Sequence, residues 1–181
     1  MRLFTGISLP YEVRRNIDFL FQHLQPLAAI AWSPIENLHV TTKFIGEWPD
    51  DRLGEISAAL RSMPKPAPFR LTLSGLGWFP NPDHPRVFFI AVQPDPALTE
   101  LASVTDSTLV QSGVPGETKP YQPHLTLARI KTEAELLPLK QAIAGLPSVD
   151  FGHIEARKFH LYQSKPGPGG SLYSVIEEFP L

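Results

Sequence analysis

Two segments of this 181-residue chain carry the same pattern 85 positions apart (124 − 39). His39 is followed two residues later by Thr41, and His124 is followed two residues later by Thr126. Both segments have the residue pattern of a β-strand, in which residues two apart face the same side. Each segment therefore presents an imidazole beside a hydroxyl, a combination suited to binding a phosphate oxygen.

A similar offset recurs elsewhere in the chain. Arg2-Leu3-Phe4 matches Arg86-Val87-Phe88 at a spacing of 84 (86 − 2). The repeated offset predicts an internally duplicated chain, organised as one domain over 1–181 with halves of about 1–84 and 85–181.

Hydrophobic periodicity predicts the order β-α-β-α-β in each half, followed by one last strand. Stretches rich in glycine are predicted to be connections, namely a loop over 75–82 and a turn over 166–170. The predicted strands are 2–9, 37–45, 69–74, 86–93, 124–130, 150–163 and 172–179, and the predicted helices are 13–25, 50–63, 96–112 and 133–144.

Composition excludes several classes of protein. With 43% hydrophobic and 19% charged residues, the chain can bury a substantial core. The absence of Cys excludes a disulfide framework, a thiolate metal site and a Cys nucleophile. A net charge of −2 argues against bulk coating of nucleic acid, so any such contact must come from a local cluster. No apolar run approaches a membrane span and the start lacks a signal-peptide pattern, so we expect a soluble, cytoplasmic protein.

Two common kinds of site are not predicted. Neither glycine-rich stretch has the lysine and spacing of a phosphate-binding loop before a helix. No His-x-His or His-Glu-x-x-His spacing supports a metallohydrolase, and we expect neither a metal nor another cofactor.

The paired segments suggest acid-base chemistry. The unperturbed pKa of histidine lies near neutrality, so one ring of a pair can take a proton while the other gives one. If the halves pack about an approximate two-fold axis, His39 and His124 face each other across a cleft, and Thr41 and Thr126 donate hydrogen bonds into it. The alternative is two structural strand histidines, but the matched threonines favour the site. The remaining histidines are expected to be structural or surface residues: His23, His84, His153 and His160.

Several segments together resemble a known family, the RNA 2′,3′-cyclic phosphodiesterases. This family is the bacterial and archaeal branch of the two-histidine phosphoesterases, formerly called 2′-5′ RNA ligases. The resemblance runs nearly from end to end. It is carried by the two His-x-Thr segments, the opening 2–10, the stretch 32–47, the lead-in 120–124 and the late stretch 159–164.

The resemblance implies a fold, a reaction and roles for residues. The fold is α+β, with two pseudo-symmetric lobes of antiparallel sheet, outer helices and a cleft between the lobes. The reaction opens a terminal 2′,3′-cyclic phosphate on RNA without a metal and leaves a 2′-phosphate. His39 would be the general acid, His124 the general base, and Thr41 and Thr126 would bind phosphate oxygens. A profile of rate against pH centred near neutrality is expected.

Neighbours of the motifs are weaker candidates. Arg129 matches a basic residue often found five places after the second histidine of the family, but an ideal pleat points it away unless a bulge intervenes. Lys43 shares the ideal face of the first histidine and could sit at the cleft rim, or be a solvated strand residue. Trp32 and Tyr121 could stack a terminal base, or belong to the core. Thr42 replaces the family's usual Leu and should affect packing only.

Two questions stay open at this stage. The same cleft could be a non-catalytic module that binds a nucleotide or an RNA end without turnover, although retention of both His and both Thr argues against lost catalysis. Joining of RNA ends in a 2′-5′ linkage without ATP could accompany hydrolysis.

Overall fold

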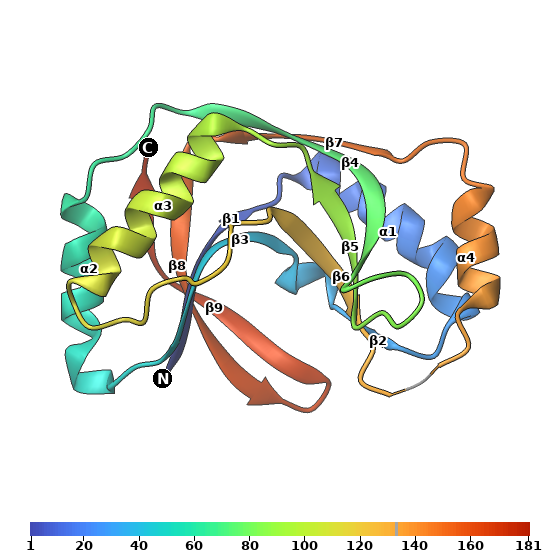
Figure 1. The fold of residues 1–181 in the computed structure, drawn as a ribbon, viewed down its shortest axis with the longest axis horizontal. Coiled ribbons are helices and arrows are strands. Elements are labelled where there is room, and N and C mark those ends of the chain that lie inside the picture. Colours follow the sequence, from blue (N-terminus) through green and yellow to red (C-terminus); the bar gives the residue numbers. More distant parts are fainter. Residues whose placement is uncertain (133) are drawn as a thin grey trace.

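The strands of this protein form two antiparallel sheets with helices beside each of them (Figure 1). The computed structural model describes residues 1–132 and 134–181. The strand order is β3-β1-β8-β9 in the first sheet and β2-β6-β5-β4-β7 in the second. The strands are β1 (Arg2–Ser8), β2 (Ala31–Trp32), β3 (His39–Glu47), β4 (Phe69–Phe79), β5 (Val87–Val92), β6 (His124–Arg129), β7 (Asp150–Ala156), β8 (Lys158–Gly167) and β9 (Gly170–Pro180).

In the described part of the chain, four α-helices and three short 3₁₀ helices connect these strands. Asp95 begins one α-helix, because its side chain accepts hydrogen bonds from the backbone of Ala97 and Leu98. Among the described residues, no helix has both the length and the apolar character needed to cross a membrane. The helices are α1 (Tyr11–Leu24), η1 (Gln25–Leu27), η2 (Ile35–Asn37), η3 (Asp50–Arg52), α2 (Leu53–Ser62), α3 (Pro96–Val110) and α4 (Leu137–Ala144).

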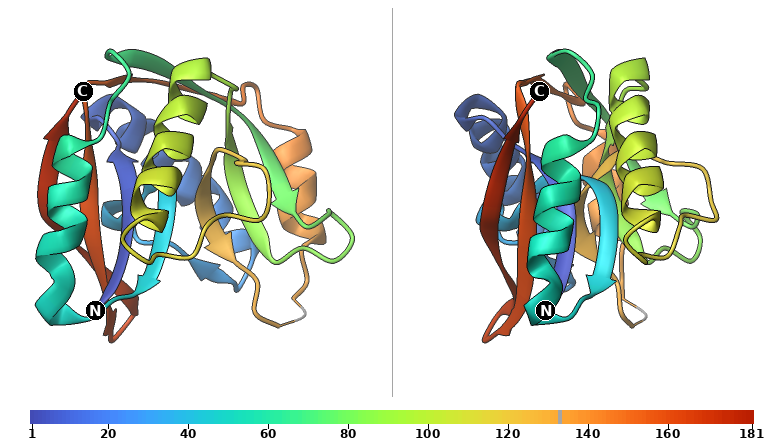
Figure 2. Two further views of the ribbon diagram at one scale, coloured as in Figure 1. Left: turned by 60° about the vertical axis from the view of Figure 1, so that its left-hand side comes forward. Right: turned by 90° about the vertical axis from the view of Figure 1, so that its left-hand side faces the viewer.

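The chain passes repeatedly between the two sheets. Helix α1 follows β1 of the first sheet but packs against β7 of the second, and α3 follows β5 of the second sheet but packs against β3 of the first. Figure 2 shows α2 and α3 side by side next to the first sheet. Apolar side chains from both sheets belong to one continuous core, including Leu3 and Val40 from the first sheet and Leu71 and Phe88 from the second. The two lobes are therefore built from interleaved segments around a shared interior.

Each histidine strand contains a β-bulge at the same place. The pairing of β3 with β1 leaves Thr42 without an opposite residue, and the pairing of β6 with β5 leaves Leu127 without one. Both residues lie three positions after the histidine of their strand. A bulge shifts the alternation of side chains by one residue. The residue five places after each histidine, Phe44 or Arg129, therefore faces the same side as the histidine.

Two of the predicted strands differ from the structure by more than two residues at one end. The predicted loop 75–82 is wrong in part, because β4 continues to Phe79 and pairs with β5 along this stretch. Gly75, whose φ of 98° suits glycine, lies at an irregularity in this pairing between Leu73 and Leu76, and the strand continues past it. The predicted strand 150–163 is two strands, since at Arg157 the chain leaves the second sheet and enters the first.

The last helix is shorter than predicted. Position 133, where the prediction begins, lies outside the described residues, and helix α4 begins at Leu137. Pro138 lies in its first turn. A helix that began at 133 would place this proline in its interior, where proline removes a hydrogen bond and clashes with the preceding turn.

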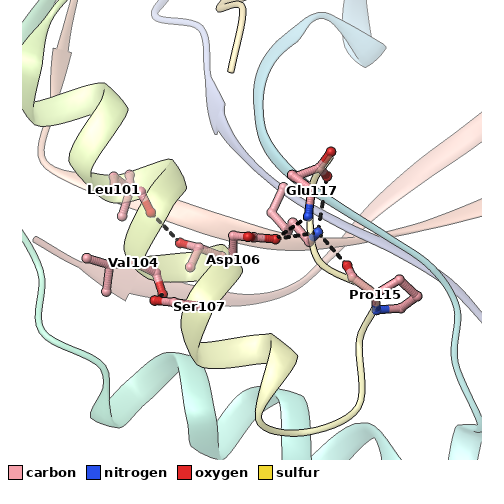
Figure 3. Close-up of polar contacts among 8 residues, drawn as sticks. Leu101, Val104, Asp106, Ser107, Pro115 and Glu117 are labelled. Carbon is pink, nitrogen blue, oxygen red and sulfur yellow. Dashed lines mark hydrogen bonds and ion pairs between the residues drawn. The ribbon is translucent and has the colours of Figure 1, made fainter. Parts of the chain in front are cut away.

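A buried cation ties the segment between α3 and β6 to the first sheet. The ammonium of Lys43 donates to Asp106 Oδ1 at 2.8 Å, to the Pro115 carbonyl at 2.9 Å and to Glu117 Oε1 at 3.1 Å. Figure 3 shows Asp106 reaching from its helix toward Pro115 and Glu117 on the connecting segment. Close by, the Tyr121 hydroxyl donates to the Thr41 carbonyl at 2.6 Å. The chain that leads into β6 is thus held against β3.

The asymmetric burial of this cluster gives a prediction about stability. The side chain of Lys43 is 2% exposed, whereas those of Asp106 and Glu117 are 26% and 54% exposed. Asp106→Ala leaves a buried ammonium short of a partner, and we expect it to lower the free energy of unfolding by about 3 kcal/mol. Lys43→Met removes the buried charge and leaves carboxylates that water can reach, so it should cost about 1 kcal/mol. Urea unfolding followed by circular dichroism measures both.

A matched control is Arg70→Gln, which removes an exposed pair with Glu155 and should change stability little. A larger loss in Lys43→Met than in Asp106→Ala would contradict this description of the cluster.

Candidate active site

A cleft of about 810 Å³ lies between the two sheets and contains both predicted motifs. His39 and Thr41 line it from β3, and His124 and Thr126 line it from β6. The bulges do not disturb the shared face of these four residues, because each bulge lies after the histidine and the threonine of its strand. The structure therefore brings together the two segments that the sequence places 85 residues apart.

Each imidazole is oriented by the backbone carbonyl of the residue two positions before it. His39 Nδ1 lies 2.6 Å from the Asn37 carbonyl oxygen, and His124 Nδ1 lies 2.7 Å from the Gln122 carbonyl oxygen. A carbonyl oxygen only accepts, so Nδ1 carries the hydrogen in both rings. The Nε2 atoms are consequently the ones available for proton transfer.

The first histidine is closely packed by aromatic rings. Phe4 stacks on His39 with centroids 4.7 Å apart and an angle of 30° between the rings, and Tyr173 meets it edge-on at 5.5 Å. Gly6 leaves room for this packing, since a Cβ there would lie 3.2 Å from the His39 ring and 2.9 Å from the Val40 carbonyl oxygen. Burial is the largest cause that lowers the pKa of His39 from 6.5 to about 4, with smaller contributions from the charges of Arg129 and His124.

The second histidine lies in a more open environment. Phe79 and Phe89 approach the His124 ring at centroid distances of 5.0 and 5.6 Å, both steeply inclined to it. Burial lowers the pKa of His124, and Arg129 lowers it further. Both rings are therefore favoured in their neutral forms at neutral pH in the free protein.

The two threonines differ in their contacts. Thr41 Oγ1 lies 2.8 Å from His39 Nε2, so in the neutral ring its hydroxyl donates to that nitrogen. Within the described residues, the Thr126 hydroxyl has no hydrogen-bond partner, and it faces the cleft. A ligand in the cleft can therefore accept from Thr126 directly, whereas Thr41 has to share its hydroxyl with His39.

Arg129 lies in the cleft because of the bulge in β6. Its side chain lines the same cavity as the histidines, and its charge affects the pKa of both. The bulge that Arg129 requires in order to face the cleft is present at Leu127. Arg129 thus supplies a fixed positive charge near both imidazoles.

Lys43 does not lie at the cleft rim, and the expectation that it shares the face of His39 is wrong. The bulge at Thr42 turns Lys43 to the opposite side, where it is buried against acidic side chains instead of being solvated. Thr42 itself faces the interior, where its hydroxyl lies 2.7 Å from that of Thr5.

The two aromatic candidates have separate positions. Trp32 lines the cleft, while its indole N–H donates to the Ala28 carbonyl and its ring packs against Phe21. Tyr121 is not among the residues that line the cleft. Burial raises the pKa of Tyr121, so its hydroxyl keeps the proton that it donates to β3.

Sequence reasoning missed other residues that line the cleft. The offset of 84 residues singled out the segment with Arg2 and Phe4, but did not connect it with the site. Phe44 and Tyr173 carried no signal, because the bulge and the strand neighbours that place them are not visible in a single sequence. All four line the cleft.

Across residues 1–132 and 134–181, no three or more side chains of His, Cys, Asp or Glu are grouped so that they could hold a metal ion. The cleft instead combines two imidazoles, two hydroxyls and a guanidinium. These groups can bind a tetrahedral anion and move protons on two sides of it.

Comparisons with known proteins agree with this architecture. The family model described as LigT like Phosphoesterase matches residues 7–89 and again residues 90–173. The RNA 2′,3′-cyclic phosphodiesterase of Methanocaldococcus jannaschii is 35% identical over 179 residues, which cover 99% of this chain and all of that protein. The protein of the same name from Thermus thermophilus is 34% identical, covering 100% of this chain and 90% of that one.

Solved structures give the same result. A crystal structure of a Thermus thermophilus protein has a TM-score of 0.83 and 33% identity, covering 100% of this chain and 98% of that one. The crystal structure of E. coli LigT complexed with 3′-AMP has a TM-score of 0.82 and 27% identity, covering 99% of this chain and 97% of that one. Because the family model matches almost the whole chain in two consecutive copies, this protein belongs to the LigT-like phosphoesterase family.

Proposed function

We propose that this protein hydrolyses RNA 2′,3′-cyclic phosphodiester ends to 2′-phosphates, with His39 and His124 as the groups that transfer protons. The observation that carries the proposal is the matched pair of imidazoles, each held through Nδ1 by its own backbone and lining one cleft between the sheets. The names of the relatives from Methanocaldococcus jannaschii and Thermus thermophilus support the choice of substrate.

In the proposed reaction, water attacks phosphorus in line with the bond to the 3′ oxygen. His124 Nε2 removes a proton from the water, and His39 donates a proton to the departing 3′ oxygen. The phosphorus–3′ oxygen bond breaks, and the phosphate remains on the 2′ oxygen. Thr41, Thr126 and Arg129 hold the remaining oxygens. The assignment of acid and base follows the family resemblance.

The electrostatics of the cleft suit a site that becomes active when the phosphate binds. Burial and Arg129 favour neutral rings before binding. A bound phosphodiester brings a negative charge between the rings and raises their pKa values. One ring can then hold the extra proton that the departing oxygen requires.

The same groups support two further proposals. If a 5′-hydroxyl replaced water as the attacking group, the product would be a 2′-5′ linkage formed without ATP.

We also propose that the halves 1–84 and 85–181 form one domain, supported by the matched bulges and the two consecutive matches of the family model. A cytoplasmic location stays a prediction.

Replacement of the histidines tests the central proposal. His39→Ala and His124→Ala should each lower kcat on a cyclic-phosphate oligonucleotide about a hundredfold to ten-thousandfold, because removal of a general acid or base typically costs this much. Thr126→Val should be milder, since it removes one hydrogen bond worth about 1.5 to 3 kcal/mol to a charged group. Thr41→Val should cost more than Thr126→Val, because it also removes the contact with His39.

Circular dichroism separates lost chemistry from lost folding in these variants. A histidine variant that keeps near-wild-type turnover while folded would refute the two-histidine mechanism. A wild-type protein that binds the oligonucleotide but never hydrolyses it would favour the binding-module alternative, and folded histidine variants that bind it as well would agree with that alternative.

The dependence of rate on pH is a second test. The profile of kcat/KM reports groups of the free enzyme, and the general acid loses its proton as pH rises through its pKa. Both histidine pKa values are lowered below 6.5, so the alkaline limb of kcat/KM should lie below pH 6.5, on the acid side of the neutral centre expected from sequence. The alkaline limb of the kcat profile should lie at higher pH than that of kcat/KM, since bound phosphate raises the pKa values of the histidines. An alkaline limb of kcat/KM above pH 7 would contradict the proposed burial effect.

EDTA should leave the rate unchanged if the histidines alone move the protons. Loss of activity on chelation, with recovery on addition of a divalent ion, would favour a metallohydrolase.

The products provide a third test. Separation of 2′- and 3′-phosphate ends after complete hydrolysis should give mainly 2′-phosphate. A product that is mainly 3′-phosphate would mean that the 2′ oxygen departs, and the acid and the base would then have the opposite positions relative to the substrate.

A further inference from the structure

The cleft has more positive charge than one phosphate group requires. Besides Arg129, three basic side chains line it, and Glu47 is the single carboxylate in the lining that the described residues provide. Glu47 lies 3.8 Å from the ammonium of Met1, so part of its charge is already compensated. The additional cations are Arg2, Lys131 and Lys165. A chain with a net charge of −2 thus concentrates unbalanced positive charge in one cavity.

Two of these cations lie on the wall formed by the first sheet. The Arg2 guanidinium lies 5.1 Å from the centre of the Phe44 ring, which lines the cleft. Lys165 precedes Pro166, which pairs with Ser171 in the β8–β9 hairpin. In the described part of the chain, neither cation has a hydrogen bond to a histidine or threonine of the two motifs.

The opposite wall has the third cation at its outer end. Lys131 lies two residues beyond Arg129, where the chain leaves β6. In Figure 1 the β8–β9 hairpin and the chain leaving β6 project toward the same edge of the molecule. The Asn37 side chain donates to the Ser171 carbonyl at 2.7 Å and so connects the hairpin to the lead-in of β3.

Many other basic residues already have acidic partners. Arg61 pairs with Glu177, and Arg70 pairs with Glu155. In the part of the chain that the structure describes, no ion pair involves Arg2, Lys131 or Lys165, although all three face a common cavity. A run of anions would compensate their charges.

We propose that Arg2, Lys131 and Lys165 bind backbone phosphates of the nucleotides that precede the cyclic end, so that the protein acts on the 3′ end of an RNA strand in preference to a free cyclic nucleotide. This inference rests on the proposed function. Phosphodiesters of a single strand repeat along the chain, as the cations do along the cleft, and Lys and Arg contacts with them are salt-dependent. The phosphate at the histidines provides the chemistry, and the outer phosphates provide affinity.

The experiment compares two substrates in the double variant Lys131→Gln/Lys165→Gln. One substrate is a 2′,3′-cyclic mononucleotide, and the other is a trinucleotide with a 2′,3′-cyclic end. Each exposed ion pair contributes up to roughly fivefold, so kcat/KM on the trinucleotide should fall roughly fivefold to twentyfold. The value for the mononucleotide should stay within roughly twofold, because this substrate has no phosphate besides the reacting one.

Salt gives an independent measurement of the same interactions. The slope of log kcat/KM against log salt concentration on the trinucleotide should become shallower by about 0.7 for each phosphate that the variant no longer binds. Lys158→Gln is the matched control, because it removes a lysine from the opposite end of β8 and should leave both substrates unaffected.

The outcomes separate this inference from the function on which it rests. Equal losses on both substrates, or an unchanged trinucleotide, would overturn the role of the outer cations. A wild-type protein that hydrolyses neither substrate would overturn the proposed function. In that case, binding of a trinucleotide with a 3′-phosphate would still test whether the cations bind backbone phosphates. Equal affinities of the variant and the wild type would reject that role.

Discussion

An extra residue three positions after each histidine determines which side chains enter the cleft. Thr42 and Leu127 are these bulge residues, and each reverses the alternation of the residues directly after it. In β6 the reversal brings a guanidinium to the reacting centre, and in β3 it brings Phe44, which is 49% exposed. The two walls are alike at the histidines and differ beyond the bulges, one having a cation where the other has an aromatic ring.

The same bulge in β3 connects the site to the packing of the lobes. It turns Lys43 inward, where the ammonium binds carboxylates of α3 and of the segment that leads to β6. A buried ammonium requires such partners, because desolvation of an unpaired charge is costly. The ion pairs and the hydroxyl of Tyr121 fix this connecting segment on β3 immediately before His124. Separation of the two histidine strands therefore depends on a cation that touches neither histidine.

Features that depend on adjacent residues could be predicted from the sequence. The predictions that differ from the structure concern features that depend on pairing between distant strands. The His-x-Thr pairs were visible because side-chain alternation in a strand depends on adjacent residues alone, and the order of strands and helices followed from periodicity. The prediction that Lys43 shares the face of His39 failed at a bulge, which depends on register with β1. The undivided strand 150–163 failed because the chain changes sheets at Arg157, and the loop 75–82 failed because pairing with β5 extends β4. The position of Arg129 in the cleft could be predicted only on condition of a bulge, which depends on the register of β6 with β5.

The carbonyl that holds each Nδ1 belongs to the residue two positions before the histidine, so each ring is oriented within three consecutive residues that lead into its strand. Each ring therefore keeps its orientation relative to its own strand. The relative position of the two Nε2 atoms then depends on how the two sheets pack, and hence on the core that they share. A substitution in that core, far from the cleft, would alter both proton transfers together.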